Sequence, residues 1–501
     1  MKSGLRFVPF MVLGMMTVLG MNFPKPILAA PHSAATQDCL SCHVQATPGI
    51  VSDWQRSRHA KVTPGEAMAV EPMARKVSSP NVPQELKNHS VGCAECHTLR
   101  ADAHKDTVEH HGYKVYVVTS PEDCRICHQE EAGQYQRNLM AHAHTNLMKN
   151  PLYGQLVDAI NGLQVFQNAA LQAMPPMPHT NEDSCLSCHG TDVQVRGTVS
   201  RDTDFGEMDF VVLTGWPNVG VGRLNPDGSN GSCASCHVRH SFSIEVARKP
   251  ETCSQCHKGP DVPAYKVYSV SKHGNLYGSQ KGSWNFTNVP WVVGKDMNAP
   301  TCATCHVSLL VDEGKNVVAQ RSHAMNDRLP WRIFGLVYAH PHPREAQVHT
   351  LRSADGLTLP TNLDGTWQAD ALIDETEQGK RRAAMQGVCR ACHGTQWVQG
   401  HWERFEKTIL ETNRMTKTAT DIMVHAWKNQ RVQGPPDNPF DEPLERRWVE
   451  QWLFFANSIR FSSAMMGADY SVFDNGRWFQ SKGLREMEWM ERMLSPGSVG
   501  R

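Results

Sequence analysis

Hydrophobic residues recur at helical spacing over 401–501. Intervals of three and four residues place each series on one face of a helix. The segment Gly434-Pro435-Pro436-Asp437 is a clear break in the pattern. We predict long amphipathic helices here, with a further helix over 479–494. The apolar series are Trp402, Phe405, Ile409 and Leu410; Ile422, Met423, Ala426 and Trp427; and Leu444, Trp448, Trp452, Phe455, Ala456 and Ile459.

The aromatic faces of these helices have two interpretations. Trp and Phe are common in protein cores, and they are also enriched at protein interfaces. The region 401–501 is therefore predicted either to pack against the rest of the chain or to form an oligomer surface.

The polarity pattern of 36–400 is irregular. Pro and Gly are abundant, and long alternation of apolar and polar residues is missing. The apolar stretch 210–222 can hold a short strand, but Gly215 and Pro217 interrupt it. We expect a mainly α fold with short helical turns and many loops, followed by the helical region 401–501.

The amino terminus has the pattern of an export signal. Two basic residues precede the apolar run Phe7 to Met21, and small residues follow it. We predict a signal peptide over 1–35 with cleavage near 30–35, although Pro31 disfavours a cut directly before it. An uncleaved anchor is the alternative, but the run is short for a span of about 20 residues. The mature protein is expected to be soluble and periplasmic.

The charge balance of the chain argues mainly against one class of partner. Lys and Arg total 50, Asp and Glu total 50, and the formal net charge is +0. Proteins that bind nucleic acids usually carry an excess of positive charge. The totals therefore argue against a nucleic-acid partner.

All 16 cysteines belong to eight copies of Cys-x-x-Cys-His. The two thiols are spaced to add to the two vinyl groups of one haem, and the histidine is then held beneath the iron as an axial ligand. Zinc sites and disulfides also use paired cysteines, but neither explains a histidine after every second cysteine. The predicted attachment residues are Cys39, Cys42, Cys93, Cys96, Cys124, Cys127, Cys185, Cys188, Cys233, Cys236, Cys253, Cys256, Cys302, Cys305, Cys389 and Cys392, and the proximal ligands are His43, His97, His128, His189, His237, His257, His306 and His393.

The histidines outside the motifs determine which haems only carry electrons and which can bind a small molecule. Of 25 histidines, eight are proximal, so 17 remain as candidates for the opposite face of a haem. Two histidines saturate the iron, whereas an open position allows a small molecule to bind. The best candidates for distal ligands are His59, His144, His179, His240, His323, His340, His342 and His401. The 22 methionines are expected to be core residues instead.

Two stretches carry a resemblance beyond the repeated motif. Residues 225–275 include HVRHSFSIEVARKPETCSQCHKGPD, and 321–343 reads RSHAMNDRLPWRIFGLVYAHPHP. With the eight motifs and the helical tail, the chain resembles the octahaem hydroxylamine oxidoreductase family, whose relatives include hydrazine dehydrogenases and reductive enzymes acting on nitrite or hydroxylamine. The resemblance implies seven electron-transfer haems and one catalytic haem at the fourth motif, Cys185-Leu186-Ser187-Cys188-His189. That motif ends in histidine, as in the oxidative members, and not in lysine.

The resemblance also implies a role for Tyr470. Oxidative members have a tyrosine in a Gly-x-Asp-Tyr setting, which bonds covalently to the catalytic porphyrin of a neighbouring subunit in a trimer. This chain has Gly467-Ala468-Asp469-Tyr470, although the residues that follow match the family only loosely. A homotrimer with this link is the expectation.

The resemblance places a distal histidine over the catalytic iron, and His273 in Ser-Lys-His-Gly-Asn is the best match. The family has an aspartate beside it, whereas Lys272 precedes His273 here. The carboxylate is then Asp261 or Asp327. Tyr338 is the first choice for a distal phenol, with Tyr265 as the alternative.

These features predict an exported hydroxylamine oxidoreductase that gives nitric oxide or nitrite. Its electrons are expected to pass to a small soluble cytochrome c. The alternatives are hydrazine oxidation, reduction of nitrite or hydroxylamine, and a non-catalytic electron conduit with two histidines on every iron.

Overall fold

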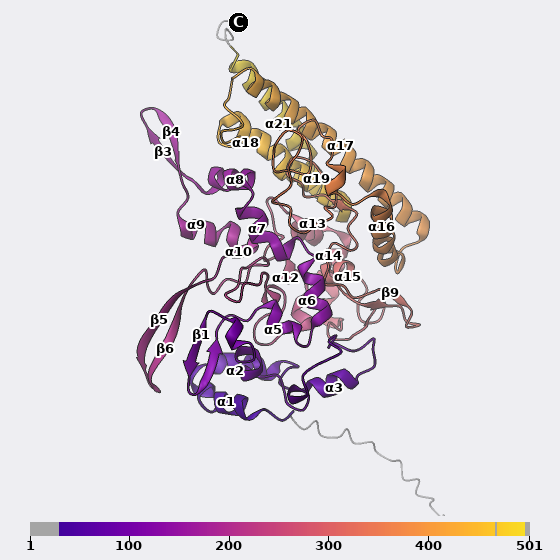
Figure 1. Cartoon of the computed structure of the whole chain (residues 1–501). Helices are drawn as coiled ribbons and strands as arrows, with labels where there is room; N and C mark the ends of the chain where they lie inside the picture. The colour runs from indigo at the N-terminus through magenta and orange to yellow at the C-terminus, as the bar shows by residue number, and fades with distance from the viewer. Residues whose placement is uncertain (1–29, 466–467, 496–501) are drawn as a thin grey trace, which may run out of the picture.

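The computed structural model describes residues 30–465 and 468–495. It is 47% helical with few short strands, so the prediction of a mainly α fold is confirmed. Figure 1 shows short helices and loops in the lower two thirds and long helices at the top. The predicted signal peptide falls almost wholly outside the described residues. Within them, no helix combines the length and hydrophobicity that a membrane span requires.

The helices before residue 310 are short because Pro, Gly and the repeated motifs interrupt them. They are α1 (Ala34–Ala46), α2 (Pro48–Arg56), α3 (Pro64–Ala69), α4 (Cys93–His97), α5 (Pro121–Arg125), α6 (Gln129–Gln136), α7 (Ala143–Met148), α8 (Pro151–Asn161), α9 (Pro178–Asp183), α10 (Cys185–His189), α11 (Ile244–Arg248), α12 (Pro250–Cys253), α13 (Ala264–Val270), α14 (Lys272–Gln280) and α15 (Cys302–His306).

The strands form small antiparallel hairpins and one three-stranded sheet of order β7-β8-β9. The hairpin β5–β6 contains only the first part of the predicted strand 210–222. Both β3–β4 and β5–β6 project from the body in Figure 1. The strands are β1 (Thr107–His110), β2 (Tyr113–Tyr116), β3 (Leu163–Gln167), β4 (Ala170–Met174), β5 (Gln194–Thr203), β6 (Gly206–Thr214), β7 (Trp291–Val292), β8 (Leu310–Val311), β9 (Val317–Ala319), β10 (Trp331–Arg332) and β11 (His340–Pro341).

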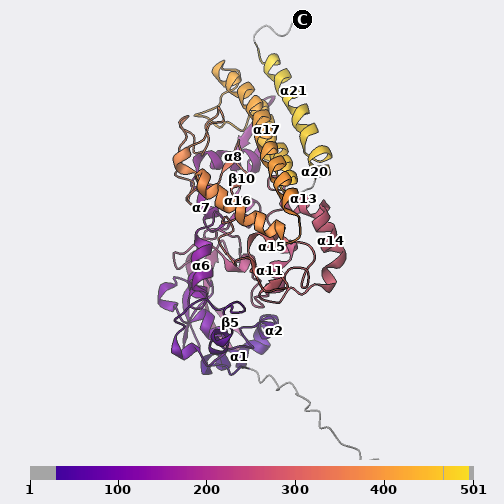
Figure 2. The same ribbon diagram turned by 90° about the vertical axis from the view of Figure 1, so that its right-hand side faces the viewer.

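The carboxy-terminal region contains the predicted long helices. The first two apolar series lie on one helix, α17, and the third continues through α18, the π-helical turn η7 and α19. Figure 2 shows α17 and α21 side by side at the top of the molecule. The bounds are α16 (Glu375–Arg390), α17 (Thr395–Lys428), α18 (Pro443–Val449), η7 (Glu450–Phe455), α19 (Ala456–Met465), α20 (Ala468–Phe473) and α21 (Arg477–Met493).

The apolar faces of these helices form a core of their own. Met423 of α17, Trp448 of α18 and Trp452 of η7 are at most 2% exposed and pack in one cluster. The packing interpretation of the aromatic series therefore holds for these residues. Other aromatic residues of this region, such as Trp478 and Trp489, remain largely exposed.

Candidate haem and substrate sites

Each Cys-x-x-Cys-His motif folds as one helical turn. Four motifs lie within α1, α4, α10 and α15, and in the others the histidine N–H donates to the first cysteine's carbonyl, as in His128 to Cys124 at 2.9 Å. Residues at i, i+3 and i+4 share one face of a helix, so both thiols and the imidazole point the same way. All 16 cysteines are free of disulfides, and the described residues contain no cluster able to hold a metal ion. The disulfide and zinc alternatives therefore find no support.

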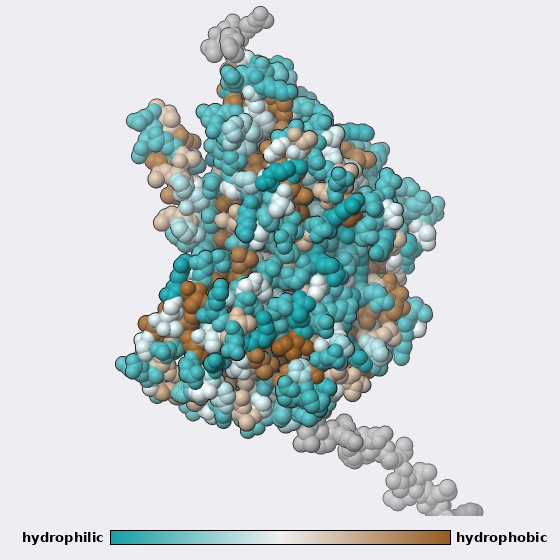
Figure 3. All heavy atoms as spheres, viewed as in Figure 1, coloured by the Kyte–Doolittle hydropathy of each residue, from teal (hydrophilic) through white to brown (hydrophobic). Residues whose placement is uncertain are grey.

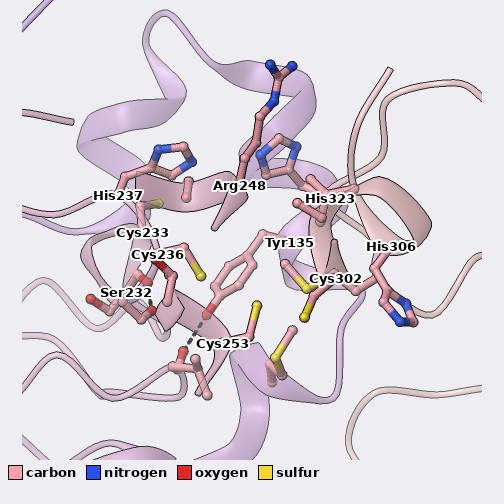
Figure 4. A pocket seen from close by; sticks show the side chains of 18 of the residues that line it. Tyr135, Ser232, Cys233, Cys236, His237, Arg248, Cys253, Cys302, His306 and His323 are labelled. Carbon is pink, nitrogen blue, oxygen red and sulfur yellow. Dashed lines mark hydrogen bonds between the residues drawn. The ribbon is translucent and has the colours of Figure 1, made fainter. Parts of the chain in front are cut away.

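One cavity of about 2920 Å³ connects the motifs and is lined by the histidines of all eight. Protein interiors are close-packed, so a void of this size needs a filling group. Figure 4 shows Tyr135 within it, surrounded by the thiols of Cys233, Cys236, Cys253 and Cys302. The residues therefore fit haem: thiols and imidazoles face a largely apolar cavity.

Histidine pairs across the cavity have the separation that a shared iron requires. Metal–imidazole bonds are about 2 Å long, so two imidazoles on one iron have ring centroids roughly 6 Å apart. Four motif histidines have a partner at 6.0–6.4 Å: His43 with His110, His128 with His59, His237 with His323, and His393 with His273. These pairs would hold haem iron on both faces.

Burial keeps these imidazoles in the neutral form that binds metals. Loss of solvent lowers the pKa of His59, His237 and His323 to about 4. The Nδ1 of His97 lies 2.8 Å from the carbonyl oxygen of Tyr116. Such a contact fixes the ring and leaves the other nitrogen for the iron. Burial and then the charge of His97 lower the pKa of His240, which places His240 near the second motif.

The eight motifs form a connected row whose order differs from the sequence. The thiols of Cys124 and Cys233 join the third motif to the fifth. The row runs first, second, third, fifth, sixth, seventh and eighth, and the fourth motif branches from the sixth. The other close pairs are Cys39 with Cys93, Cys96 with Cys127, Cys236 with Cys253, Cys188 with Cys256, Cys253 with Cys302, and Cys305 with Cys389.

The fourth motif has both a carboxylate and a guanidinium near its histidine. Among the described residues no histidine ring pairs with His189 at ligand separation, as is also true of His97, His257 and His306; the charges of Asp261 and Arg332 act on His189, and that of Asp261 acts on His257 as well. Asp261 and Arg332 both line the cavity. The Nδ1 of His189 lies 3.3 Å from the carbonyl oxygen of Ala143. The motif therefore combines an anchored imidazole with a carboxylate and a guanidinium.

The carboxy-terminal helices contact the backbone at these two charged residues. Asn457 of α19 is fully buried and donates to the carbonyl oxygen of Asp261 at 3.1 Å. Arg460, one turn later, donates to the carbonyl oxygen of Ile333, the residue after Arg332, at 3.4 Å. The Nε of Arg332 donates to the carbonyl oxygen of Phe334 at 2.9 Å. The helical region thus supports the segments that carry Asp261 and Arg332.

Comparisons with known proteins agree with this geometry. Residues 224–331 match the family described as "Seven times multi-haem cytochrome CxxCH". A solved structure titled "Hypothetical multiheme protein" is 39% identical, covers 93% of this chain and 96% of its own, and superimposes with a TM-score of 0.88. This chain belongs to the multihaem c-type cytochromes.

Two more distant relatives of the cytochrome come from Kuenenia stuttgartiensis. One is a "Probable nitrite reductase-hydroxylamine oxidoreductase fusion protein", 25% identical over 419 residues. The match covers 81% of this chain but only 39% of that protein. The other is the "reducing HAO-like protein complex", 18% identical with a TM-score of 0.59 over 92% of this chain and 85% of that one, which shows a shared fold alone.

Within this cytochrome, His273 lies next to the eighth motif. Its ring is 6.0 Å from that of His393, the same spacing as in the other ligand pairs. The structure therefore does not bring His273 to the fourth motif and favours an axial-ligand role over the substrate-facing role predicted for it. Of the two candidate carboxylates, Asp261 acts on His189, whereas Asp327 accepts from Ser322 at 2.8 Å.

The two tyrosines predicted near the fourth site occupy different places. Tyr338 is 1% exposed, donates to the carbonyl oxygen of Leu363 at 2.7 Å and packs with the helical core. It does not line the cavity, so the distal role predicted for Tyr338 finds no support. Tyr265 lines the cavity, and its N–H donates to the carbonyl oxygen of His257 at 2.8 Å.

Tyr470 is packed inside its own chain. It is 6% exposed and clusters with Val267 and Phe461, and burial raises its pKa. Val262 and Phe334, which line the cavity, pack against this cluster. Gly467 of the Gly-x-Asp-Tyr motif lies outside the described residues.

Of the histidines predicted as distal ligands, some lie beside motif histidines and others do not. His59, His240 and His323 lie beside motif histidines, as predicted. His179 is exposed, and His401 stacks on Trp397. His144 directly follows Ala143, whose carbonyl oxygen lies 3.3 Å from the Nδ1 of His189. Burial and the charge of Arg332 lower the pKa values of His340 and His342 to about 3.

Sequence reasoning missed two residues of these sites. His110 lies at ligand separation from His43. The sequence signal that could have identified it is its position at the end of β1, directly before the His111-Gly112 turn. Arg332 was contained in a quoted stretch, but only the fold brings it to His189.

Proposed function

We propose that this cytochrome is an exported oxidoreductase of small nitrogen compounds, with the fourth motif as its substrate site. Its proposed reaction is the oxidation of hydroxylamine to nitric oxide or nitrite. The observation that carries the proposal is that, among the described residues, His189 has no second imidazole at ligand separation and has the charges of both Asp261 and Arg332 acting on it, whereas His257 of the sixth motif shares only Asp261. The 25% identical relative from Kuenenia stuttgartiensis, described as a probable nitrite reductase-hydroxylamine oxidoreductase fusion protein, supports the substrate class.

The chain's own residues provide the remaining requirements. When bound, a haem with one open position on its iron can bind a small nitrogen ligand and accept electrons. Asp261 is the candidate proton acceptor, because its carboxylate lies at the cavity wall near His189. The row of motifs provides the path for electrons away from the site. In the full proposal all eight motifs carry haem and a small soluble cytochrome c receives the electrons.

The assay that tests this proposal uses hydroxylamine with an artificial electron acceptor. Asp261→Asn should lower turnover by roughly two to four orders of magnitude, the usual contribution of a general acid or base, with unchanged haem content. Asp327→Asn is the matched control and should retain activity. Equal activity of wild type and Asp261→Asn would contradict the assignment of the proton acceptor.

Reduction of nitrite or hydroxylamine is the second candidate, and Arg332 favours it. A guanidinium beside His189 would attract an anion such as nitrite more than neutral hydroxylamine. Nitrite reduction with a low-potential dye should then exceed hydroxylamine oxidation, and Arg332→Gln should raise the KM for nitrite more than Arg332→Lys does. An enzyme inactive in both directions, with no high-spin haem, would instead be an electron conduit.

A trimer linked through Tyr470 completes the proposal. The phenol would bond to the haem at the fourth motif of a neighbouring subunit. Since Tyr470 packs on Val267 and Phe461 in its own chain, assembly would have to draw α20 out of this cluster. Three such heterologous contacts around a three-fold axis close a ring.

A further inference from the structure

Two cations line the large cavity without an acidic partner. They are Lys76, which is half-buried, and Arg248, which is 5% exposed. Within the part of the chain that the structure describes, neither side chain has a carboxylate oxygen within 4.0 Å. The outer surface is mainly hydrophilic on the face drawn in Figure 3, and water solvates the charges there. A cation on the wall of an apolar cavity has no such solvation and calls for an anion.

Lys76 lies at the third motif. The ring of His128 hydrogen-bonds to the backbone of Lys76. Burial, followed by the charges of Arg58, Arg248 and Arg321, lowers the pKa of the Lys76 ammonium to about 8. All the side-chain charges that act on Lys76 are therefore positive.

Arg248, at the end of α11, is held in place by neutral groups. One terminal nitrogen donates to the carbonyl oxygens of Phe286 and Asn288 at 2.8 and 2.6 Å, and the guanidinium lies over the Trp291 ring, 4.5 Å from its centroid. The charge of Asp296 acts on Arg248, but that carboxylate accepts from the side chain of Asn288 at 2.8 Å. The other two guanidinium nitrogens have no hydrogen-bond partner among the described residues, so Arg248 has donors left for a further anion.

Two neighbouring arginines do not share this property. Arg321 is paired with Glu131 at 2.9 Å. Arg58 is exposed, so water and salt screen its charge. Lys76 and Arg248 are thus the cations of this group that are both shielded from water and uncompensated.

Haem itself supplies a suitable anion. Each haem carries two propionate groups, on the porphyrin edge opposite the vinyl groups that bond to cysteine. A cation that binds propionate should therefore face away from the thiols, and in Figure 4 the guanidinium of Arg248 points away from the thiols around Tyr135. Arginine and lysine both bind carboxylates well, and a buried charge is tolerated when it is paired.

We propose that Lys76 and Arg248 bind a propionate of the haem at the third motif, and that their charge raises the affinity of this haem for an electron. Reduction moves one electron from the reductant or a neighbouring haem to the iron, which goes from ferric to ferrous, and no bond is formed or broken. Positive charge favours the state with the additional electron, most strongly where water is excluded. The third motif stands inside the row, between the second and the fifth, so electrons would collect there. The inference requires haem at the third motif but does not depend on the nitrogen chemistry.

A potentiometric titration of the holoprotein, followed by the EPR signals of low-spin ferric haem, tests the proposal. Arg248→Gln and Lys76→Gln should each lower the midpoint potential of the same component, by about a tenfold change in its reduction constant, which is 59 mV for one electron. Arg248→Lys keeps the charge and should stay close to the wild type. Arg201→Gln, on the exposed hairpin β5–β6, is the matched control and should shift no component.

A second measurement distinguishes a propionate from a free anion such as chloride. Without Arg248, a propionate that remains unpaired in the cavity takes up a proton on reduction, because burial raises the pKa of a carboxyl group. The potential of the affected component in Arg248→Gln should then fall with rising pH more steeply than in the wild type. A potential that instead depends on chloride concentration in the wild type would overturn the proposal.

Intact-mass measurement of each variant shows whether its haems are retained, so that a lost haem is not mistaken for a shifted potential. Lys76→Gln keeps the test valid if Arg248→Gln fails to fold, because the Lys76 side chain makes no hydrogen bond among the described residues. No nitrogen substrate is present, and failure of the proposed enzymatic activity would leave the result intact. Unchanged potentials in both variants, an equal shift in Arg201→Gln, or a third motif without haem would each overturn the inference.

Discussion

His104 is a buried histidine held among carboxylates near the second motif. Its Nδ1 lies 3.3 Å from Asp106, its Nε2 lies 3.2 Å from Asp123, and Asp227 is 3.8 Å away. Its ring stacks on Tyr116 with centroids 3.7 Å apart. Burial alone would lower the pKa of His104, but the hydrogen bonds that its ring donates to Asp106 and Asp123 outweigh burial and raise the pKa to about 9.

This raised pKa predicts a pH-dependent contribution to stability. An unfolded histidine titrates near pH 6.5, so the stabilisation from charged His104 is fully present below about pH 6.5 and is lost as the pH rises through about 9. The thermal midpoint of the wild type should fall over this window, and His104→Gln should lack that component. His179→Gln, at an exposed histidine, is the control; a fall that persists in His104→Gln would assign the effect to another group.

Tyr470 provides a test of assembly. If its phenol links neighbouring subunits, denaturing gels of the wild type should retain covalent oligomers, because each chain holds its own haem through cysteine and a neighbour's through tyrosine. Tyr470→Phe preserves the ring that packs on Phe461 and should run as a monomer with its fold intact. It should also lose oxidase activity and gain reductase activity. A wild-type protein that runs as a clean monomer would remove the link and leave reduction as the leading candidate.

At the level of single residues, the repeated motif predicts where haem attaches but does not predict the distal partners. Attachment depends on local spacing, which the sequence displays directly. The partner of an imidazole depends on chain segments far apart, as with His393 and His273. The resemblance therefore assigned His273 to the fourth motif, whereas the structure has it beside the eighth. Arg332 was not singled out at all.

Among the structural elements, a close approach of two backbone segments holds the fourth motif. Gly190 follows His189 with a φ of +92°, and a Cβ at this position would lie 2.2 Å from the backbone nitrogen of Arg223. A Cβ at Gly222 would lie 2.7 Å from the carbonyl oxygen of His189. Only glycine allows these two segments to meet.

Gly190→Ala is therefore expected to disturb the fourth motif selectively. The added methyl group meets backbone rather than a flexible side chain, and the left-handed φ is strained for alanine, so we expect a loss of at least about 2 kcal/mol in unfolding free energy. Thermal unfolding should show this, together with reduced substrate turnover. The control is Gly154→Ala in α8, where a Cβ meets nothing within 4 Å; an equal effect of both variants would contradict the argument.

Helices were easier to predict than hairpins for a physical reason. The helix α17 buries one face, so apolar residues such as Phe405 and Met423 recur with helical period. The hairpins β3–β4 and β5–β6 project from the body and are largely exposed on both faces. Without one buried face a strand shows no clean alternation of apolar and polar residues, and only the end of β6 had been predicted as a strand.

For the whole molecule, haem would complete the core. The cavity of about 2920 Å³ runs past every motif, so the fold depends on what fills it. Intact-mass measurement of the mature protein should therefore show eight haem additions. A mass short by one or more haems would mean that a motif is unused, and tandem spectra of its peptide would identify which.

The spatial order of the motifs could not be predicted. Their count follows from the repeat, but the contact of Cys124 with Cys233 and that of Cys188 with Cys256 depend on how long loops fold back. Loops between 36 and 400 carry no periodic signal that would fix these returns. The fold class was thus accessible from the sequence, and the repeat predicts the haem sites, whereas the spatial order of the motifs was not accessible.

The branch at the sixth motif also sets the order in which the molecule matures. A ribosome delivers the chain from its amino terminus, so the first three motifs can assemble with each other early. The fourth motif must wait for Gly222, Cys256 and finally Arg332, all of which are synthesised after it. The surroundings of the fourth motif can therefore be completed only after those of the first three, so any chemistry that depends on Arg332 arrives late in the maturation of the protein.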